Sequence, residues 1–156
     1  MWYWLAPFLI VLALGTAFFC WRRLRSFGAV VQLERAREMF KLQRERLEIQ
    51  FLHAAAASGK PRGLIWKDCA WDDDKTIFVR ERKTGQIAAL VSVTIQFEAV
   101  PGGDMEGVAA VGNLRNASAV FFFQAGQWST VGRAVFNMNP DEAVQHFSHQ
   151  YEEVKS

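Results

Sequence analysis

The residues best suited to chemistry lie near the end of the chain, where carboxylates and imidazoles recur at helical spacing. Glu142, His146, His149 and Glu153 follow one another at intervals of four, three and four residues. On a helix this spacing places all four side chains on one side. Imidazoles one turn apart can share a divalent cation, and carboxylates can complete its coordination. The pattern suggests a metal-dependent enzyme, and the simpler alternative is an exposed helix with Glu–His pairs.

Cys69 is the second candidate for chemistry, and its neighbours oppose that role. A nucleophilic thiolate needs positive neighbours that lower its pKa, whereas Asp68 and the run from Asp72 to Asp74 are acidic. We therefore predict that Cys69 packs within a strand. The chain has no GxSxG, HExxH or CxxC motif and no phosphate-binding glycine loop. The sequence therefore favours a non-catalytic protein with no cofactor.

Three consecutive phenylalanines and one arginine form a candidate patch for a ligand or partner. Neighbouring strand residues face opposite sides of a sheet, so at least one ring of Phe121, Phe122 and Phe123 points away from the main core. Either another element covers that ring, or it is exposed to a partner or an acyl chain. Arg133, between Gly132 and Ala134, is a candidate for binding an anion, although strand arginines commonly extend to the sheet edge.

The elements that must position these residues begin with an uncharged N-terminus. Between Trp2 and Trp21 only Pro7, Gly15 and Thr16 are not hydrophobic. A helix of this length spans about 30 Å, the thickness of the hydrocarbon core of a bilayer. The headgroup region favours the aromatic side chains that flank the segment, namely Trp2, Tyr3, Trp4 and Trp21. We predict a transmembrane anchor over residues 1–21, rather than a cleaved signal peptide, because no basic region precedes the apolar run.

The orientation of the predicted anchor follows from the charges after it. Arg22, Arg23 and Arg25 follow the apolar run directly, and positive charge collects on the cytoplasmic side of a span. We therefore expect a single-pass membrane protein with its N-terminus outside and its C-terminal domain in the cytoplasm. In that reducing compartment no disulfide is expected.

Residues 22–61 are predicted to form a basic juxtamembrane segment and a helical stem. No Gly or Pro interrupts the chain from Ala29 to Ala57, and strong helix formers dominate it. The sequence from Ser58 to Pro61 then supplies a glycine and a proline that end the helix. The stem carries an apolar stripe of candidate interface residues, Leu33, Ala36, Phe40, Leu47 and Phe51.

Three interpretations of the stem remain open at this point. Its apolar stripe packs on the head domain of the same chain, or it pairs with a second copy in a parallel coiled coil. In the third interpretation the stem lies along the membrane surface. Residues 22–48 hold eight basic and four acidic side chains, a net charge of +4, and anionic lipid attracts such a segment.

Residues 62–156 are predicted to form an α+β head, in which a C-terminal helix covers a small antiparallel sheet of five or six strands. The clearest strand is residues 86–100, where apolar side chains such as Val91 and Val93 alternate with polar ones. Asn139 and Pro140 begin a helix that we expect to continue to Val154. The expected strands cover residues 64–71, 76–82, 86–100, 107–111, 117–124 and 128–137, with an acidic turn at residues 72–74.

These features predict a non-catalytic adaptor, assembly or accessory protein anchored in the membrane. The alternatives are a head that binds a lipid or another apolar ligand, and the metal-dependent enzyme. The expected partners are membrane lipids, through the N-terminal helix and the basic stem, and either a partner protein or a second copy. Nucleic acid is not expected, because the net charge is only +2.

Overall fold

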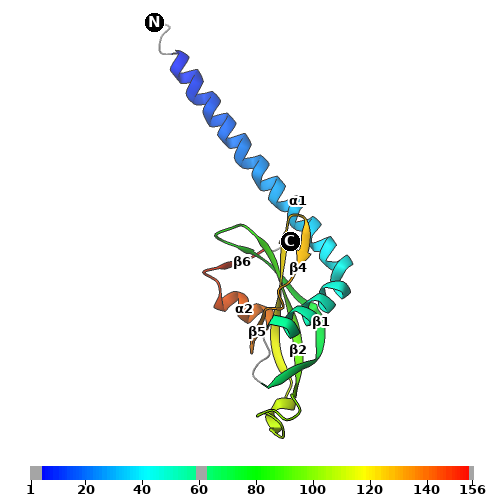
Figure 1. The fold of residues 1–156 in the computed structure, drawn as a ribbon. Coiled ribbons are helices and arrows are strands. Elements are labelled where there is room, and N and C mark those ends of the chain that lie inside the picture. The colour runs from blue at the N-terminus through cyan, green and yellow to red at the C-terminus, as the bar shows by residue number, and fades with distance from the viewer. Residues whose placement is uncertain (1–4, 59–62, 155–156) are drawn as a thin grey trace. The chain divides into compact units, whose positions relative to one another are not determined.

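The structure is a computed structural model that describes the backbone of residues 5–58 and 63–154. The chain divides between Arg35 and Ala36 into two compact units, and the elements follow one another along the chain as Figure 1 shows. In order they are α1 (Leu5–Ser58), β1 (Leu64–Glu81), β2 (Ile87–Ala99), the 3-10 helix η1 (Ala109–Gly112), β3 (Arg115–Gln124), β4 (Gln127–Ser129), β5 (Ala134–Phe136), α2 (Pro140–His146) and β6 (Tyr151–Glu153).

The first unit contains the predicted anchor, which belongs to α1 from Leu5 onward. The described residues include no helix that combines the length and the apolar character needed to cross a membrane. Trp2, Tyr3 and Trp4 lie outside the described residues, and at Trp21, Arg22, Arg23 and Arg25 only the backbone is described. The anchor and its orientation therefore stay predictions.

The second unit is built on an antiparallel sheet of six strands. The strand order is β4-β3-β2-β1-β6, and β5 pairs with β3 beside β4. A helix precedes the sheet and a short helix follows it, so the expected α+β architecture is confirmed in outline. The longest pairing joins β1 to β2, from Leu64↔Ala99 to Arg80↔Ile87.

The prediction of an acidic turn at residues 72–74 is wrong, because β1 continues through these residues as one strand. Between the pairs Trp71↔Val93 and Thr76↔Val91, residues 72–75 oppose only Ser92, which is an irregularity of the bulge type. The Arg44 side chain of α1 donates to the carbonyl oxygen of Asp72 at 3.3 Å and to Thr76 Oγ1 at 3.2 Å. The first contact gives a donor to a backbone carbonyl in the irregular stretch, where β2 offers no regular partner.

Two further strands differ from the expectation. The apolar run at residues 107–111 contains the start of η1 instead of a strand. The expected strand at residues 128–137 is divided into β4 and β5, because Gly132 between them has a φ of +72° that no strand accommodates. The spacing of apolar residues does not reveal this break, because apolar residues lie on both sides of it.

The C-terminal helix is much shorter than expected. Its start is as predicted: Asn139 Oδ1 accepts from the Glu142 amide, and the Glu142 carboxylate accepts from the Asn139 amide, which completes a capping box. Its extension beyond His146 is wrong. After His146 the chain turns, and Tyr151–Glu153 pairs with β1 as β6, since edge pairing with β1 satisfies backbone groups that a longer helix would leave unpaired on that strand.

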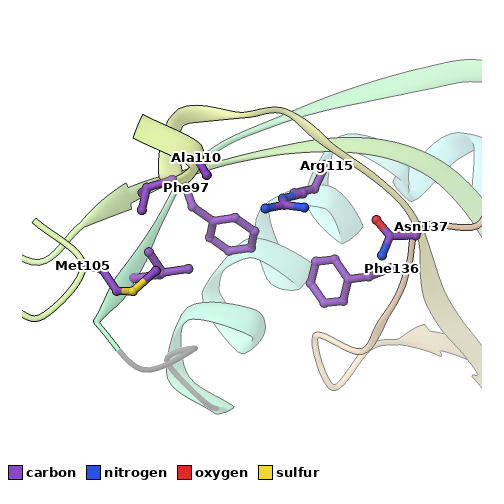
Figure 2. Close-up of a pocket in the computed structure, with 8 residues that line it drawn as sticks. Phe97, Met105, Ala110, Arg115, Phe136 and Asn137 are labelled. Atoms are coloured by element: carbon purple, nitrogen blue, oxygen red, sulfur yellow. The ribbon is translucent and has the colours of Figure 1, made fainter. Parts of the chain in front are cut away.

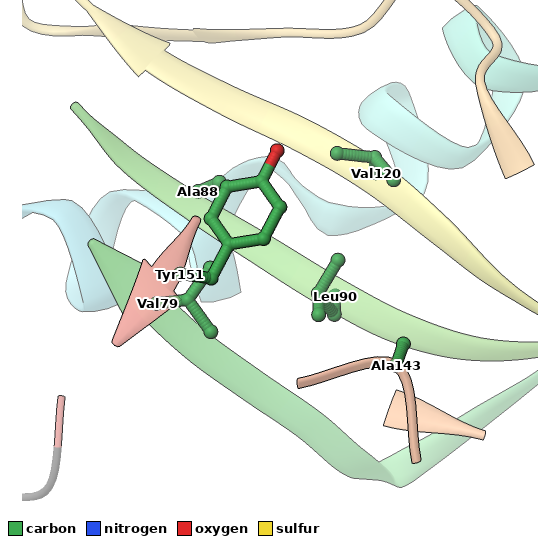
Figure 3. Close-up of a cluster of buried hydrophobic side chains, with 6 residues drawn as sticks. All are labelled: Val79, Ala88, Leu90, Val120, Ala143 and Tyr151. Atoms are coloured by element: carbon green, nitrogen blue, oxygen red, sulfur yellow. The ribbon is translucent and has the colours of Figure 1, made fainter. Parts of the chain in front are cut away.

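The two faces of the sheet have different partners. In β2 the side chains of Val91, Val93 and Ile95 are buried and face the stem, whereas Ser92 and Thr94 on the other face are half-buried. The second face carries a cluster around Leu90 and Tyr151, which α2 and β6 help to close (Figure 3). Its buried members are Val79, Ala88, Leu90, Val120, Ala143 and Tyr151.

The second half of the stem packs on the first face of the sheet, as the first of the three stem interpretations has it. Leu33, Ala36, Phe40, Leu47 and Phe51 are all buried. The Phe40 ring meets Phe121 at 5.5 Å and Trp128 at 4.9 Å between centroids. The residues that the coiled-coil interpretation needed are therefore covered by the sheet of the same chain from Ala36 onward.

Candidate functional site

A cavity of the second unit with a mainly apolar lining lies at one end of the sheet face that carries the stem. It has a volume of about 310 Å³, is partly open to solvent, and lies beside η1 and the start of β3 at the end of the β1–β2 pair where Leu64 begins β1. Leu64 and Phe97 line it from β1 and β2, and Ala110 and Val111 line it from η1. We call this cavity the Arg115 pocket.

The other lining residues come from β3, from β5 and from the residue after β5. Arg115 is the first residue of β3, Phe136 ends β5 and Asn137 follows it. Figure 2 shows the side chains of Phe97, Arg115 and Phe136 converging on one space. Among the residues that the structure describes, the Arg115 guanidinium has no hydrogen-bond or ion-pair partner. None of the lining residues is acidic, so the pocket is apolar with one uncompensated positive charge.

Local backbone conformations build the walls of the Arg115 pocket. Asn137 has a φ of +58°, which asparagine tolerates better than most residues. Gly63 has a φ of +76°, and an added Cβ there would lie 3.2 Å from Met105 Cγ, another lining atom. A side chain at residue 63 would therefore be strained by its backbone conformation and would press on Met105.

The predicted patch residues are divided between the two sheet faces. Phe121 and Phe123 are buried on the stem face, where Phe121 lies 5.8 Å from the Phe51 ring. Phe122 is on the opposite face and lines a second cavity of about 170 Å³ together with Arg133. Phe122 and Arg133 therefore line one cavity, but the three rings do not form one exposed patch.

The second cavity is more polar than the Arg115 pocket. Glu81, Gln150 and Tyr151 line it beside Arg133. Hydrogen bonds from Thr84 and Gln150 lower the pKa of the Glu81 carboxyl, and burial raises the pKa of Tyr151. Glu81 Oε1 accepts from Gln150 Nε2 at 3.3 Å, so the polar groups of this cavity largely satisfy one another.

The four residues of the suggested metal site do not share one helix. Glu142 and His146 belong to α2, His149 lies in the turn after it, and Glu153 is the last residue of β6. Among the side chains that the structure describes, no three from His, Cys, Asp or Glu gather closely enough to hold a metal ion. The helical spacing that motivated the site is therefore not present in the fold.

Cys69 lies in β1, paired with Ile95, at the margin of the stem. It lines a shallow cavity with Ile49, Leu52 and Trp71, whose rim carries the carboxylates of Glu45, Glu48 and Asp68. Burial, followed by the negative charge of Asp68, raises the pKa of the Cys69 thiol to about 11. The thiol therefore stays protonated at neutral pH, and the cavity offers no positive charge to activate it.

Sequence reasoning missed the Arg115 pocket, because its lining comes from five separate elements and loops. Nothing local marks Arg115, Phe97 or Phe136 as members of one site. Comparison with known proteins finds no family model, no curated protein and no solved structure that matches this chain.

Proposed function

We propose that the protein is a single-pass membrane-anchored, non-catalytic adaptor or accessory protein whose α+β head works in the cytoplasm next to the membrane. The observation that carries this proposal is that the second half of the stem is part of the core of the head. Trp128 Nε1 donates to the carbonyl oxygen of Ala36 at 2.8 Å in a buried position. Arg37 Nη2 donates to the carbonyl oxygen of Val154 at 2.6 Å.

These contacts bear on function because they leave no flexible linker between head and stem. The helix that contains the predicted anchor continues without interruption into residues that the sheet buries. The head is therefore tethered through the same helix to whatever the N-terminal segment binds. Such an attachment suits a protein that presents a binding surface more than one that must diffuse to a substrate.

The stem also offers a surface for a partner protein. Leu42 and Ile49 are 86% and 60% exposed, and their separation of seven residues places them on the same side of α1. Exposed apolar residues that repeat at this spacing are typical of helices that receive a second helix. The partner in this proposal is a protein that covers Leu42 and Ile49.

Membrane attachment is tested with charges placed in the apolar run. In Leu12→Arg/Leu14→Arg the two arginines each cost about 2.5–3.5 kcal/mol at the centre of a span. We expect the wild-type chain to stay in the membrane pellet after alkaline carbonate extraction and the double variant to appear in the supernatant. The matched control Leu12→Ile/Leu14→Ile should stay in the pellet, and extraction of the wild-type chain would refute the anchor.

The partner surface is tested by co-purification of the full-length chain followed by mass spectrometry. We expect one stoichiometric protein that Leu42→Glu/Ile49→Glu removes. The control Val108→Glu/Val131→Glu changes two exposed apolar residues elsewhere on the second unit and should retain the partner. Recovery of only the chain itself, lost in the same variant, would indicate self-association in place of an adaptor role.

A further inference from the structure

We propose that the Arg115 pocket binds a small organic acid, with the carboxylate of the ligand on Arg115 and its apolar body against the exposed side of the Phe97–Phe136 ring pair. This inference is independent of the membrane anchor and of the partner surface on the stem. It rests on the size, the lining and the charge of the pocket.

The lining defines the apolar part of the ligand. Leu64, Phe97, Met105, Val111 and Phe136 supply aliphatic, thioether and aromatic surface. The Phe97 and Phe136 rings lie 6.2 Å apart between centroids with an interplanar angle of 37°. Phe136 is still 41% exposed, so an apolar group that covered its ring would gain the free energy of removing that surface from water.

The charge defines the polar part of the ligand. Among the described residues that line the pocket, only Arg115 is charged, and no carboxylate in the same part of the chain neutralises it. A guanidinium presents paired N–H donors whose geometry matches a carboxylate. Asn137 also lines the pocket and carries a side-chain amide that can donate to a ligand.

The volume limits the size of the ligand. The pocket encloses about 310 Å³, and a water-sized group occupies about 30 Å³, so roughly ten non-hydrogen atoms fit. An aryl-propionate or a medium-chain fatty acid has about this size, whereas a two-chain lipid does not. The ligand class is therefore a monocarboxylic acid with a short aliphatic or aromatic body.

Binding is tested with 3-phenylpropionate as the probe and the full-length chain in phosphatidylcholine nanodiscs. Saturation-transfer NMR, with empty nanodiscs as the blank, reports the affinity. Trp66 packs on Phe97 at 5.1 Å and on Phe136 at 6.2 Å, so indole fluorescence gives a second readout. We expect saturable binding of the acid and at least roughly tenfold weaker binding of 3-phenylpropanol, which lacks the charge.

Two variants locate the site. Arg115→Leu keeps an aliphatic side chain at this position and removes the charge. We expect it to weaken the binding of 3-phenylpropionate by roughly ten- to a hundredfold and to leave the binding of 3-phenylpropanol unchanged. Ala110→Trp fills the pocket from η1, and we expect it to abolish binding of both compounds. The matched control Arg133→Leu removes the arginine of the second cavity and should bind 3-phenylpropionate like the wild-type chain.

Several outcomes would overturn the proposal. Equal binding of the alcohol and the acid would show that Arg115 does not select the ligand. Binding that Arg115→Leu and Ala110→Trp leave intact would place the ligand elsewhere, and competition by inorganic phosphate would indicate a general anion site. Binding only of a peptide with a C-terminal aromatic residue, and not of the free acid, would indicate a protein ligand.

Discussion

The two faces of the sheet are closed by different kinds of structure. The stem face is aromatic: Phe51 lies 5.4 Å from Trp71 and 5.8 Å from Phe121, and Phe40 lies 5.6 Å from Phe78. The opposite face is mainly aliphatic, with Val79, Leu90 and Val120 under α2 and β6. A long helix covers the first face, whereas short elements that follow the sheet in sequence cover the second.

This difference indicates which part of the chain contributes most to the stability of the head. Phe40 and Phe51 of α1 contribute large apolar area and edge-to-face contacts with rings of the sheet, so the burial of the stem face requires residues from α1. The second face buries smaller side chains, and Ser92 and Thr94 remain partly exposed on it. The stem from Ala36 onward is therefore a structural part of the head, while α2 acts as a smaller lid on the other side.

The largest effect is expected from Phe51→Ala on the stem face. Phe51 is fully buried and contacts the rings of Trp66, Trp71 and Phe121, so its removal should lower the free energy of unfolding by about 3–5 kcal/mol. Val120→Ala on the opposite face should cost about 2 kcal/mol. Urea denaturation followed by circular dichroism measures both, and equal losses would remove the distinction between the faces.

The next effect is expected from Gly132→Ala. Gly132 has a φ of +72°, and an added Cβ would overlap the backbone of Ala54 and Ala55 in α1. Gly126 has a φ of +78° with open space around it, so Gly126→Ala is the matched control. Both variants should lose about 1–2 kcal/mol to backbone strain, and Gly132→Ala should lose about 1–3 kcal/mol more because α1 must move. Equal thermal shifts would show that α1 yields freely at this contact.

A pair of tryptophans on the stem face isolates one hydrogen bond. Trp128 Nε1 donates to Ala36, whereas Trp66 Nε1 is buried without an acceptor in the described part of the chain. Both Trp→Phe changes remove a similar volume, so Trp128→Phe should cost about 1–2 kcal/mol more than Trp66→Phe, because the first removes a buried hydrogen bond and the second removes an N–H that has no acceptor. The reverse order in chemical denaturation would contradict the assigned hydrogen bond.

On the opposite face, Asn139→Ala removes the capping box of α2. We expect a loss of about 1 kcal/mol in the free energy of unfolding, because the Glu142 amide loses its acceptor. Asn139→Asp keeps an acceptor and should stay close to the wild-type chain. Hydrogen exchange measures where stability is lost. We expect faster exchange of the α2 amides in Asn139→Ala and unchanged exchange of the amides in α1, which covers the other face of the sheet.

The smallest effect concerns Cys69 at the margin of the stem face. Its folded-state pKa of about 11 lies above the ordinary 9.0. The folded chain therefore holds the proton more tightly, and its contribution is complete below pH 9 and is lost between pH 9 and 11. Because the thiol is only about half buried, we expect less than about 1 kcal/mol. In a Cys20→Ser background, Cys69→Ala should lose less stability than its parent over that range, and parallel curves would contradict the shifted pKa.

The sequence alone predicted the ends of helices that carry capping or helix-ending residues. The stem ends at Ser58, where a glycine and a proline follow, and α2 begins at Pro140 after the Asn139 cap. The alternation along the second half of β2, from Val91 to Phe97, also predicted which of those side chains are buried, because the period of two is a property of the strand itself.

Only the tertiary structure decided the rest. The turn expected at Asp72 became part of β1 because β2 and Arg44 supply partners for it, and the helix expected to reach Val154 ended at His146 because β1 pairs with Tyr151 and its neighbours. The Arg115 pocket joins residues from Leu64 to Asn137. Spacing along the chain reports what one element does by itself, whereas pairing between strands and the walls of a cavity depend on segments that meet only after folding.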